Sequence, residues 1–430
     1  MDKLFDINEI KDRINLNLIK LRDNPYYQIG QVFSPSDYDW YGDKEGRALL
    51  SFVSHYKISG VEIPCMHEMM KLMPQKTNGQ LFFGPFAGEV IHEQQLSGHS
   101  WLLRGLCEYY EQFNDAFALE MINSICKNLY LPTKGRYHTY PIERNPNAEG
   151  AVSGSIMERL KYWALSSDVG CAFMSIDGLS HAYKVLKDDE IKALVDEMID
   201  VYLAIDKVKL MVQTHCTLTA ARGMMRMYDI TGESKYLDGA ISIWVLYTEH
   251  GGMTYTYQNA NWWGRNDTWT EPCAIVDSLM LSCQLYLATG DEKYRKTAAR
   301  IYHNGLATAQ RDSGGAGTDT VVTRDAGGTD TLYMLMIEAF FCCSMRLTEG
   351  LWYVNEHQDL LYAEVTGKVE KQENGVYMDG DIIYAEMENA DKYLNGTPVV
   401  VDGHTLYPLL KYYNIPRADA DLIKQKVIFD

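Results

Sequence analysis

One pattern recurs along this chain and limits its fold more than any other feature. A helix-forming stretch ends in aromatic residues, a short polar turn follows, and a second helix-forming stretch begins. Segments Met227–Tyr236 and Leu285–Tyr294 are near copies of this unit, and looser versions begin at Glu108 and Ala182. The glycine in each close copy suits the left-handed residue that ends a helix. The acidic residue after it suits the first turn of the next helix.

The spacing of these units, roughly 45 to 70 residues, is typical of helical hairpins rather than of short solenoid repeats. Residues 40–310 leave room for five or six such hairpins. Closing them into a ring would bury every inner helix, which accounts for apolar runs such as Ile275–Leu287. We therefore expect an all-α (α/α)6 toroid with a cleft at the ends of its inner helices.

The helical pattern breaks after residue 310. Residues 311–330 are polar and rich in glycine, which predicts a loop lining the cleft. We expect helix to return over Thr331–Leu347 and short strands to follow in a small β-rich or mixed tail. The expected strands are Leu360–Val365, Ile382–Met387 and Pro398–Val401.

These patterns predict two domains. Residues 1–350 would form the toroid with an N-terminal arm, irregular and helical up to about Pro35. Residues 351–430 would form the small C-terminal appendage.

Composition excludes several classes of partner. The chain has 58 acidic and 40 basic residues, a formal net charge of -18, which disfavours nucleic acid and anionic membranes. No apolar run approaches the length of a transmembrane helix, and the start at Met1 lacks the apolar core of a signal peptide. Nine cysteines, an odd number, indicate reduced thiols and hence a cytoplasmic protein. A homodimer is compatible with the sequence.

Two clusters of residues carry the chemistry. Glu271-Pro-Cys273 lies at the start of an apolar helical run, and Cys342-Cys343 lies far downstream. Three thiols and a carboxylate complete a tetrahedral zinc shell. A zinc-bound thiol loses its proton at neutral pH, which makes it a candidate nucleophile. Taken singly, each cysteine would read as a buried core residue.

Four motifs resemble the β-L-arabinofuranosidase family of cysteine- and zinc-dependent glycoside hydrolases. They are Tyr41–Arg47, the Gly98-His99 pair leading to Glu108–Tyr110, Asn266–Ala274, and Cys342-Cys343. The resemblance runs from about Trp40 to Arg346, and the last two motifs are its most specific part.

The resemblance implies a zinc ion held by Glu271, Cys273, Cys342 and Cys343. Cys342 would be the nucleophile of a retaining exo-glycosidase that releases a terminal furanose, L-arabinofuranose by analogy. This differs from the usual pair of carboxylates in glycosidases. His99 and His215 match histidines that contact the sugar, and the substrate would be a carbohydrate or glycoside.

The chain departs from the family in three places. The family's catalytic glutamate has no counterpart in Gly251–Tyr257, and Glu249 just upstream is the candidate replacement. Ser344-Met345 stand where the family has prolines, and the large C-terminal β domain is shortened.

Two adjacent tryptophans, Trp262 and Trp263, lie in a polar stretch before Arg265. A core position explains such a pair poorly, so we expect one ring to be exposed and to stack on sugar. The 30 tyrosines of the chain have two explanations, a sugar cleft or simply a large helical core.

Two other functions stay open. A toroid-fold sugar lyase or epimerase would abstract a proton from carbon, with Tyr255, Tyr257 or His250 as the base. A non-hydrolytic carbohydrate-binding protein with structural zinc would also explain the missing glutamate.

Overall fold

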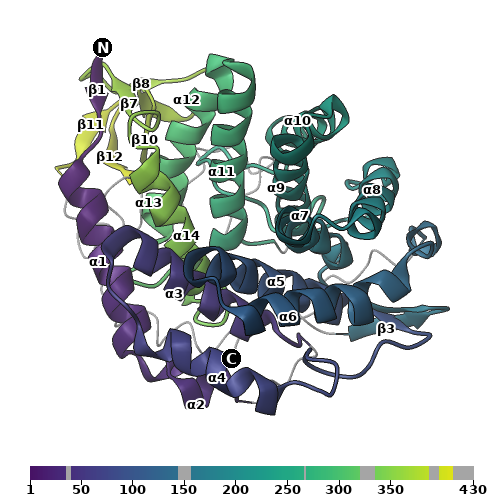
Figure 1. The fold of residues 1–430 in the computed structure, drawn as a ribbon. Coiled ribbons are helices and arrows are strands. Elements are labelled where there is room, and N and C mark those ends of the chain that lie inside the picture. Colours follow the sequence, from purple (N-terminus) through teal and green to yellow (C-terminus); the bar gives the residue numbers. More distant parts are fainter. Residues whose placement is uncertain (35–39, 144–155, 266–267, 320–334, 387–396, 410–430) are drawn as a thin grey trace. The chain divides into compact units, whose positions relative to one another are not determined.

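The computed structural model describes all residues except 35–39, 144–155, 266–267, 320–334, 387–396 and 410–430 (Figure 1). The chain divides into two compact units, each described here by itself. The first unit comprises Met1–Leu21, Trp244–Asn261 and Asn266–Asp430. The second comprises Arg22–Ile243 and Trp262–Arg265. The predicted division at residue 350 stays a prediction.

The second unit is mainly helical. Its α-helices are α2 (Ile29–Val32), α3 (Asp43–Ser59), α4 (Pro64–Lys76), α5 (Glu93–Phe113), α6 (Ala116–Ile125), α7 (Ser175–Leu186), α8 (Asp189–Ala204), α9 (Thr214–Thr231) and the first part of α10 (Ser234–Glu249). Short helical turns lie at η1 (Pro25–Tyr27), η2 (Cys126–Tyr130), η3 (Leu131–Thr133), η4 (Tyr137–Thr139) and η5 (Cys171–Met174). Strands β2 (Ile91–His92), β3 (Ile156–Leu160) and β4 (Trp163–Ser166) form a sheet in the order β2-β4-β3.

Helices α3, α5, α7 and α9 pack against one another in chain order (Figure 1). Glycines allow the close approach. A Cβ on Gly46 would lie 2.2 Å from the backbone nitrogen of Leu102, and one on Gly178 would lie 2.6 Å from the carbonyl oxygen of Ser100. Both distances are far below van der Waals contact, so these positions accept no side chain. The sequence therefore sets the spacing of the inner helices by residues that lack a Cβ.

The repeated turns form as predicted. Gly232 ends α9 and Gly290 ends the later helix α11 (Pro272–Thr289), with φ angles of +72° and +70°. Each glycine N–H donates to a tyrosine carbonyl four residues earlier. Asp291 then caps the next helix by accepting from the Lys293 N–H. This local chemistry explains why the turn sequence is copied along the chain.

The first unit holds the remaining helices and most of the strands. Its helices are α1 (Ile7–Asp23, up to Leu21), the end of α10, α11, α12 (Glu292–Arg300), η6 (Ile301–Leu306), α13 (Ala307–Ala309) and α14 (Cys343–Glu356). Its strands are β1 (Asp2–Leu4), β5 (Gly317–Asp319), β6 (Leu335–Glu338), β7 (Ala363–Val365), β8 (Glu370–Lys371), β9 (Tyr377–Asp379), β10 (Ile382–Ala385), β11 (Val399–Val401) and β12 (His404–Pro408).

The predicted β-rich tail is present. A five-stranded sheet in the order β11-β12-β10-β9-β8 contains the expected strands β10 and β11. The third expected strand, β7, pairs antiparallel with β1 at the N-terminus. The N-terminal arm is thus tied into the first unit, where Asn17 of α1 donates to the Gly314 carbonyl at 2.8 Å.

The predicted helix over Thr331–Leu347 is wrong for Leu335–Cys342 and holds for Cys343–Leu347, whereas residues 331–334 lie outside the described residues. Residues Leu335–Glu338 form β6, antiparallel to β5, and α14 begins only at Cys343. A short apolar run does not distinguish strand from helix, and here pairing with a distant segment decides. Most of the predicted glycine-rich loop, residues 320–330, lies outside the described residues.

Helix α11 of the first unit is largely buried, with apolar side chains on all its sides. Within the described parts of the chain it is also the one helix long and apolar enough to cross a membrane, contrary to our expectation that no such run exists. Because 72% of its window is buried in the protein, it has the character of a core helix.

Candidate metal centre

The four predicted ligands lie at the N-terminal ends of two helices of the first unit. Glu271 is the N-cap of α11, where Pro272 occupies the first turn, and Cys273 follows directly. Cys342 is the N-cap of α14 and Cys343 is its first residue. Cys342 is therefore not inside a helix, as the sequence suggested, but at a bend with φ −129° and ψ −59°. Because α11 and α14 pack together, segments 70 residues apart meet.

The donor atoms converge on one point. The Sγ atoms of Cys273 and Cys343 lie 3.6 Å apart, and those of Cys342 and Cys343 lie 3.4 Å apart. One ligand atom from each of the four residues lies within 4.8 Å of all the others. A disulfide would need about 2.05 Å between sulfurs. Zn–S bonds of about 2.3 Å in a tetrahedron place sulfurs about 3.8 Å apart. The arrangement therefore fits a metal ion better than a disulfide.

Burial distinguishes the three thiols. Cys273 and Cys343 are fully buried, whereas Cys342 is partly exposed. Burial, together with the neighbouring sulfurs of Cys273 and Cys342, raises the pKa of the Cys343 thiol well above its usual range. A bound cation and the positive ends of two helices act in the opposite direction and favour thiolates. The donor set is thus suited to hold a soft divalent ion.

The backbone of Glu271, the carboxylate residue of the cluster, is held by the side chain of Asn259. The side-chain oxygen of Asn259 accepts a hydrogen bond from the Glu271 N–H at 2.7 Å, and Asn259 is fully buried. Next to Asn259, Gln258 donates to the Thr308 hydroxyl at 3.3 Å. These polar contacts fix the extended residue that precedes α11. Sequence analysis did not single out Asn259, since an asparagine in a loop gives no signal of this role.

Glu249, the predicted acid, is the last residue of α10 and is exposed to solvent. It belongs to the same unit as the four ligands but is not part of their buried cluster. Its role as acid stays a prediction.

The predicted sugar-binding histidines lie in the second unit. His99 is in the second turn of α5 and fully buried, and both of its ring nitrogens contact backbone groups. Nδ1 donates to the Gln95 carbonyl at 2.7 Å, and Nε2 accepts from the Phe83 N–H at 3.0 Å. His215 is the second residue of α9 and its ring stacks on Trp101, with centroids 5.8 Å apart. Both histidines are therefore packed in the core, and their contact with sugar stays a prediction.

The expectation of an exposed tryptophan is wrong. Trp262 and Trp263 are each 1% exposed. A backbone bridge between Gln213 and Trp262 ties this stretch to the residue before α9. The Arg265 guanidinium lies over the Trp262 ring, 4.0 Å from its centroid. Arg265, one of the polar neighbours that suggested exposure, instead lies over the Trp262 ring, and because both rings are buried, stacking on sugar would require this segment to move.

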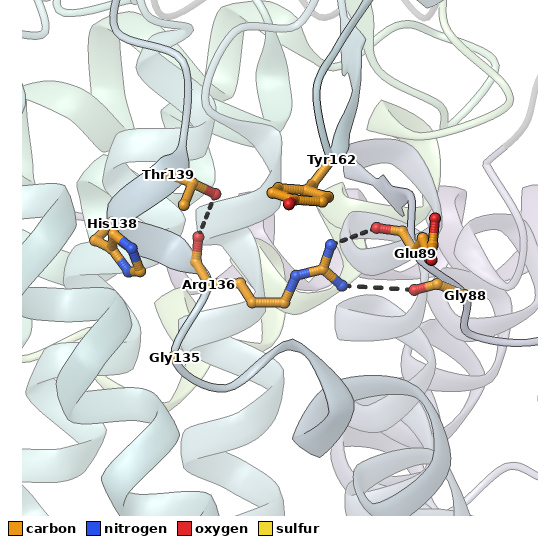
Figure 2. Close-up of a pocket in the computed structure, with 7 residues that line it drawn as sticks. All are labelled: Gly88, Glu89, Gly135, Arg136, His138, Thr139 and Tyr162. Atoms are coloured by element: carbon orange, nitrogen blue, oxygen red, sulfur yellow. Dashed lines mark hydrogen bonds between the residues drawn. The ribbon is translucent and has the colours of Figure 1, made fainter.

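A cavity of about 520 Å³ lies in the second unit, apart from any predicted site residue. Figure 2 shows Arg136 beneath the Tyr162 ring, with its guanidinium directed to the carbonyls of Gly88 and Glu89. The guanidinium is 4.9 Å from the ring centroid. The cavity is also lined by Gly135, His138 and Thr139.

A second group of possible ligands, Glu108, Glu111 and His181, lies in the second unit. Cations already surround it. Lys184 pairs with Glu111 at 2.9 Å, and Arg104 lies 3.0 Å from the Nδ1 of His181. This group therefore forms an ion-pair network rather than a metal site.

Residues 204–356 match the sequence profile described as "Beta-L-arabinofuranosidase, GH127 catalytic domain". This segment contains all four candidate ligands. No curated protein sequence matches the chain significantly.

Solved structures support the fold. A GH127 β-arabinofuranosidase has a TM-score of 0.54 at 11% identity, covering 91% of this chain and 67% of its own. An unsaturated glucuronyl hydrolase specific for heparin has a TM-score of 0.54 at 11% identity, covering 83% and 100%. A sugar epimerase from a ruminal bacterium has a TM-score of 0.51 at 14% identity, covering 82% and 98%.

The fold class predicted from the sequence, an (α/α)6 toroid with a small β-rich tail, is confirmed by these likenesses. The predicted resemblance is confirmed as well, because residues 204–356 match the β-L-arabinofuranosidase catalytic-domain profile and the fold is similar to that of a GH127 enzyme.

Proposed function

We propose that this protein is a retaining exo-glycosidase that releases a terminal furanose, L-arabinofuranose by family likeness, with the Cys342 thiolate as nucleophile. The observation that carries the proposal is the convergence of Glu271, Cys273, Cys342 and Cys343 within 4.8 Å. Among the three sulfurs, Cys342 is the partly exposed one and can meet a substrate. The two buried sulfurs and the carboxylate would hold zinc together with it.

The chain's own residues perform the bond changes. In the first step, the Cys342 sulfur attacks the anomeric carbon, a C–S bond forms and the bond to the leaving oxygen breaks. A protein acid gives its proton to that oxygen. In the second step, the same group takes a proton from water, the water oxygen attacks the anomeric carbon, and the thiolate leaves. Zinc, when bound, supplies a lowered thiol pKa and holds the sulfur in position.

Glu249 is the proposed acid. It lies at the end of α10 and is exposed to solvent. It lies in the same compact unit as Cys342 and two residues before the stretch where the family's glutamate is missing.

The epimerase alternative is supported by the likeness of fold to a sugar epimerase. The two tyrosines it would use as base have other contacts. The Tyr257 hydroxyl accepts from Arg300 at 2.9 Å, and both Tyr255 and Tyr257 pack against the apolar core of the C-terminal sheet. That alternative also assigns no chemistry to the thiol cluster. These contacts favour the glycosidase.

Labelling with an electrophile tests the proposal. Zinc-loaded protein is incubated with a furanoside bearing an electrophilic carbon at the anomeric end, and intact mass is measured. We expect one adduct in the wild type and none in Cys342→Ser. Cys283→Ser is the matched control, because Cys283 lies on α11, is 1% exposed and is outside the cluster. Persistent labelling of Cys342→Ser, or no adduct with any zinc-loaded form, would contradict the nucleophile assignment.

A further inference from the structure

We infer that Asp277 and Arg346 are positioning residues that hold α11 and α14 in the register required for the thiol cluster to form before any ion binds. The inference rests on the metal-holding role given under the proposed function. It adds that the centre is preformed by contacts between protein groups, so the ion can leave and return without unfolding the protein.

The spacing along each helix is the first observation. Asp277 follows Cys273 by four residues on α11, and Arg346 follows Cys342 by four residues at the start of α14. Residues four apart lie one above the other on a helix face, one turn away. Arg346 is also joined to its own ligand, because its N–H donates to the Cys342 carbonyl at 3.0 Å. Each of the two ligand segments is thus followed, one helical turn later in the chain, by one charged residue.

These two charged groups meet. The Arg346 Nη2 atom lies 2.5 Å from the Asp277 Oδ1 atom. The two side chains are 1% and 0% exposed. Glu349, on α14, pairs with the same guanidinium and is 2% exposed. Buried charges must be paired, and the planar guanidinium donates hydrogen bonds only in fixed directions. A slide of one helix along the other would leave a buried charge without its partner.

Close packing supports the same register. A Cβ on Gly350 of α14 would lie 2.7 Å from the Val276 Cγ2 atom of α11, next to Asp277. The two helices are therefore in close contact at this level, and position 350 accepts no side chain without displacing Val276. At the start of α11, Asn259 accepts a hydrogen bond from the Glu271 backbone N–H. The four donor groups are thus brought together by an ion pair, a helix contact and a hydrogen bond that require no metal.

Metal affinity tests the inference. Asp277→Asn keeps the size of the side chain and removes its charge, and Arg346→Met keeps most of the volume. Zinc affinity is measured by competition with a chromophoric chelator in the folded fraction, which circular dichroism defines. We expect each variant to bind zinc about 10- to 100-fold more weakly, as for other supports of metal ligands. Glu349→Gln is the matched control, because the Glu349–Arg346 pair lies within α14, and we expect near wild-type affinity.

A spectroscopic readout separates positioning from general stability. In cobalt-loaded protein, the visible d–d absorption reports the geometry of the ligands. We expect Asp277→Asn to change this spectrum at saturating cobalt, and Glu349→Gln to leave it unchanged. The double variant Asp277→Leu/Arg346→Met, made on the Glu349→Gln background, replaces all the buried charges of this cluster by uncharged groups of similar volume, which commonly preserves folding. It should fold and still bind zinc weakly.

The outcomes distinguish this inference from the proposed function. If wild type binds no zinc, the proposed function fails. If wild type binds zinc and the folded Asp277→Asn and double variants match its affinity and cobalt spectrum, only the positioning role is overturned.

Discussion

His99 provides a sharp test of whether a predicted sugar contact is instead part of the core. Its Nδ1–H donates to the Gln95 carbonyl and its Nε2 accepts from the Phe83 N–H. This bonding requires the neutral ring, because a protonated Nε2 cannot accept. Burial accordingly lowers the pKa of His99 from 6.5 to about 4.

The sign and size of the effect follow from this pKa. Between pH 6.5 and pH 4, His99 is protonated in the unfolded chain but neutral in the folded protein, so acidification favours unfolding. The stability is fully present above pH 6.5 and is lost as the pH falls towards 4. Over the whole window the loss is about 3 kcal/mol, and between pH 7 and pH 5 it is about 2 kcal/mol.

The perturbation is His99→Gln, since an amide can donate and accept at similar positions but does not titrate. Urea unfolding at pH 7 and pH 5 gives the free energies. We expect the wild type to lose about 2 kcal/mol more than the variant on acidification. His138→Gln changes an exposed histidine of the same unit and should follow the wild type. Parallel pH dependence of wild type and His99→Gln would refute the reasoning. Loss of ligand-induced stabilisation only in His99→Gln would instead indicate sugar contact.

Three further predictions follow from the fold and the site. Gly46→Ala should destabilise the protein by about 3 kcal/mol, measured by chemical denaturation, because its Cβ would overlap the backbone of α5; Gly30→Ala, in open space, should be near neutral. Glu249→Gln should slow hydrolysis of unactivated furanosides by about 10²- to 10⁴-fold but spare nitrophenyl furanosides, and equal loss on both would refute its acid role. Zinc at about 100 times its dissociation constant should stabilise the stripped protein by about 2.7 kcal/mol, seen as a higher melting temperature that a chelator reverses; no shift would contradict a native-state site.

Features of the chain that depend on local chemistry could be predicted from the sequence. The helix ends at Gly232 and Gly290 are determined by a residue that accepts positive φ, and they appear where the repeat predicts. The clustering of Glu271, Cys273, Cys342 and Cys343 was also predictable, because three soft thiols and one carboxylate suit one kind of ion. In both cases the type of residue is enough to indicate the local structure or the kind of ligand.

Features that depend on contacts between residues far apart in the chain could not be predicted from the sequence. Strand β6 exists because it pairs with β5, and nothing in its own apolar run distinguishes this from a helix. Trp262 is buried, with the Arg265 guanidinium over its ring and its backbone bridged to Gln213, whereas its polar neighbours suggested exposure. The Asp277–Arg346 pair joins residues 69 positions apart. The only sequence signal for it is the four-residue spacing from a candidate ligand on each side.

The difference between two adjacent cysteines links the fold to the proposed chemistry. Cys343 starts α14 and is fully buried, whereas Cys342 precedes the helix at a bend and is partly exposed. A continuous helix through both residues would set their side chains about 100° apart around one axis. The bend instead lets both sulfurs lie 3.4 Å apart while only one of them reaches the surface. A cluster that serves structure alone gains nothing from an exposed sulfur, so the bend at Cys342 favours a reactive thiol. In metal-free protein, a small alkylating agent should therefore modify Cys342 well before Cys273 or Cys343, and equal rates at all three would remove this support for a nucleophile.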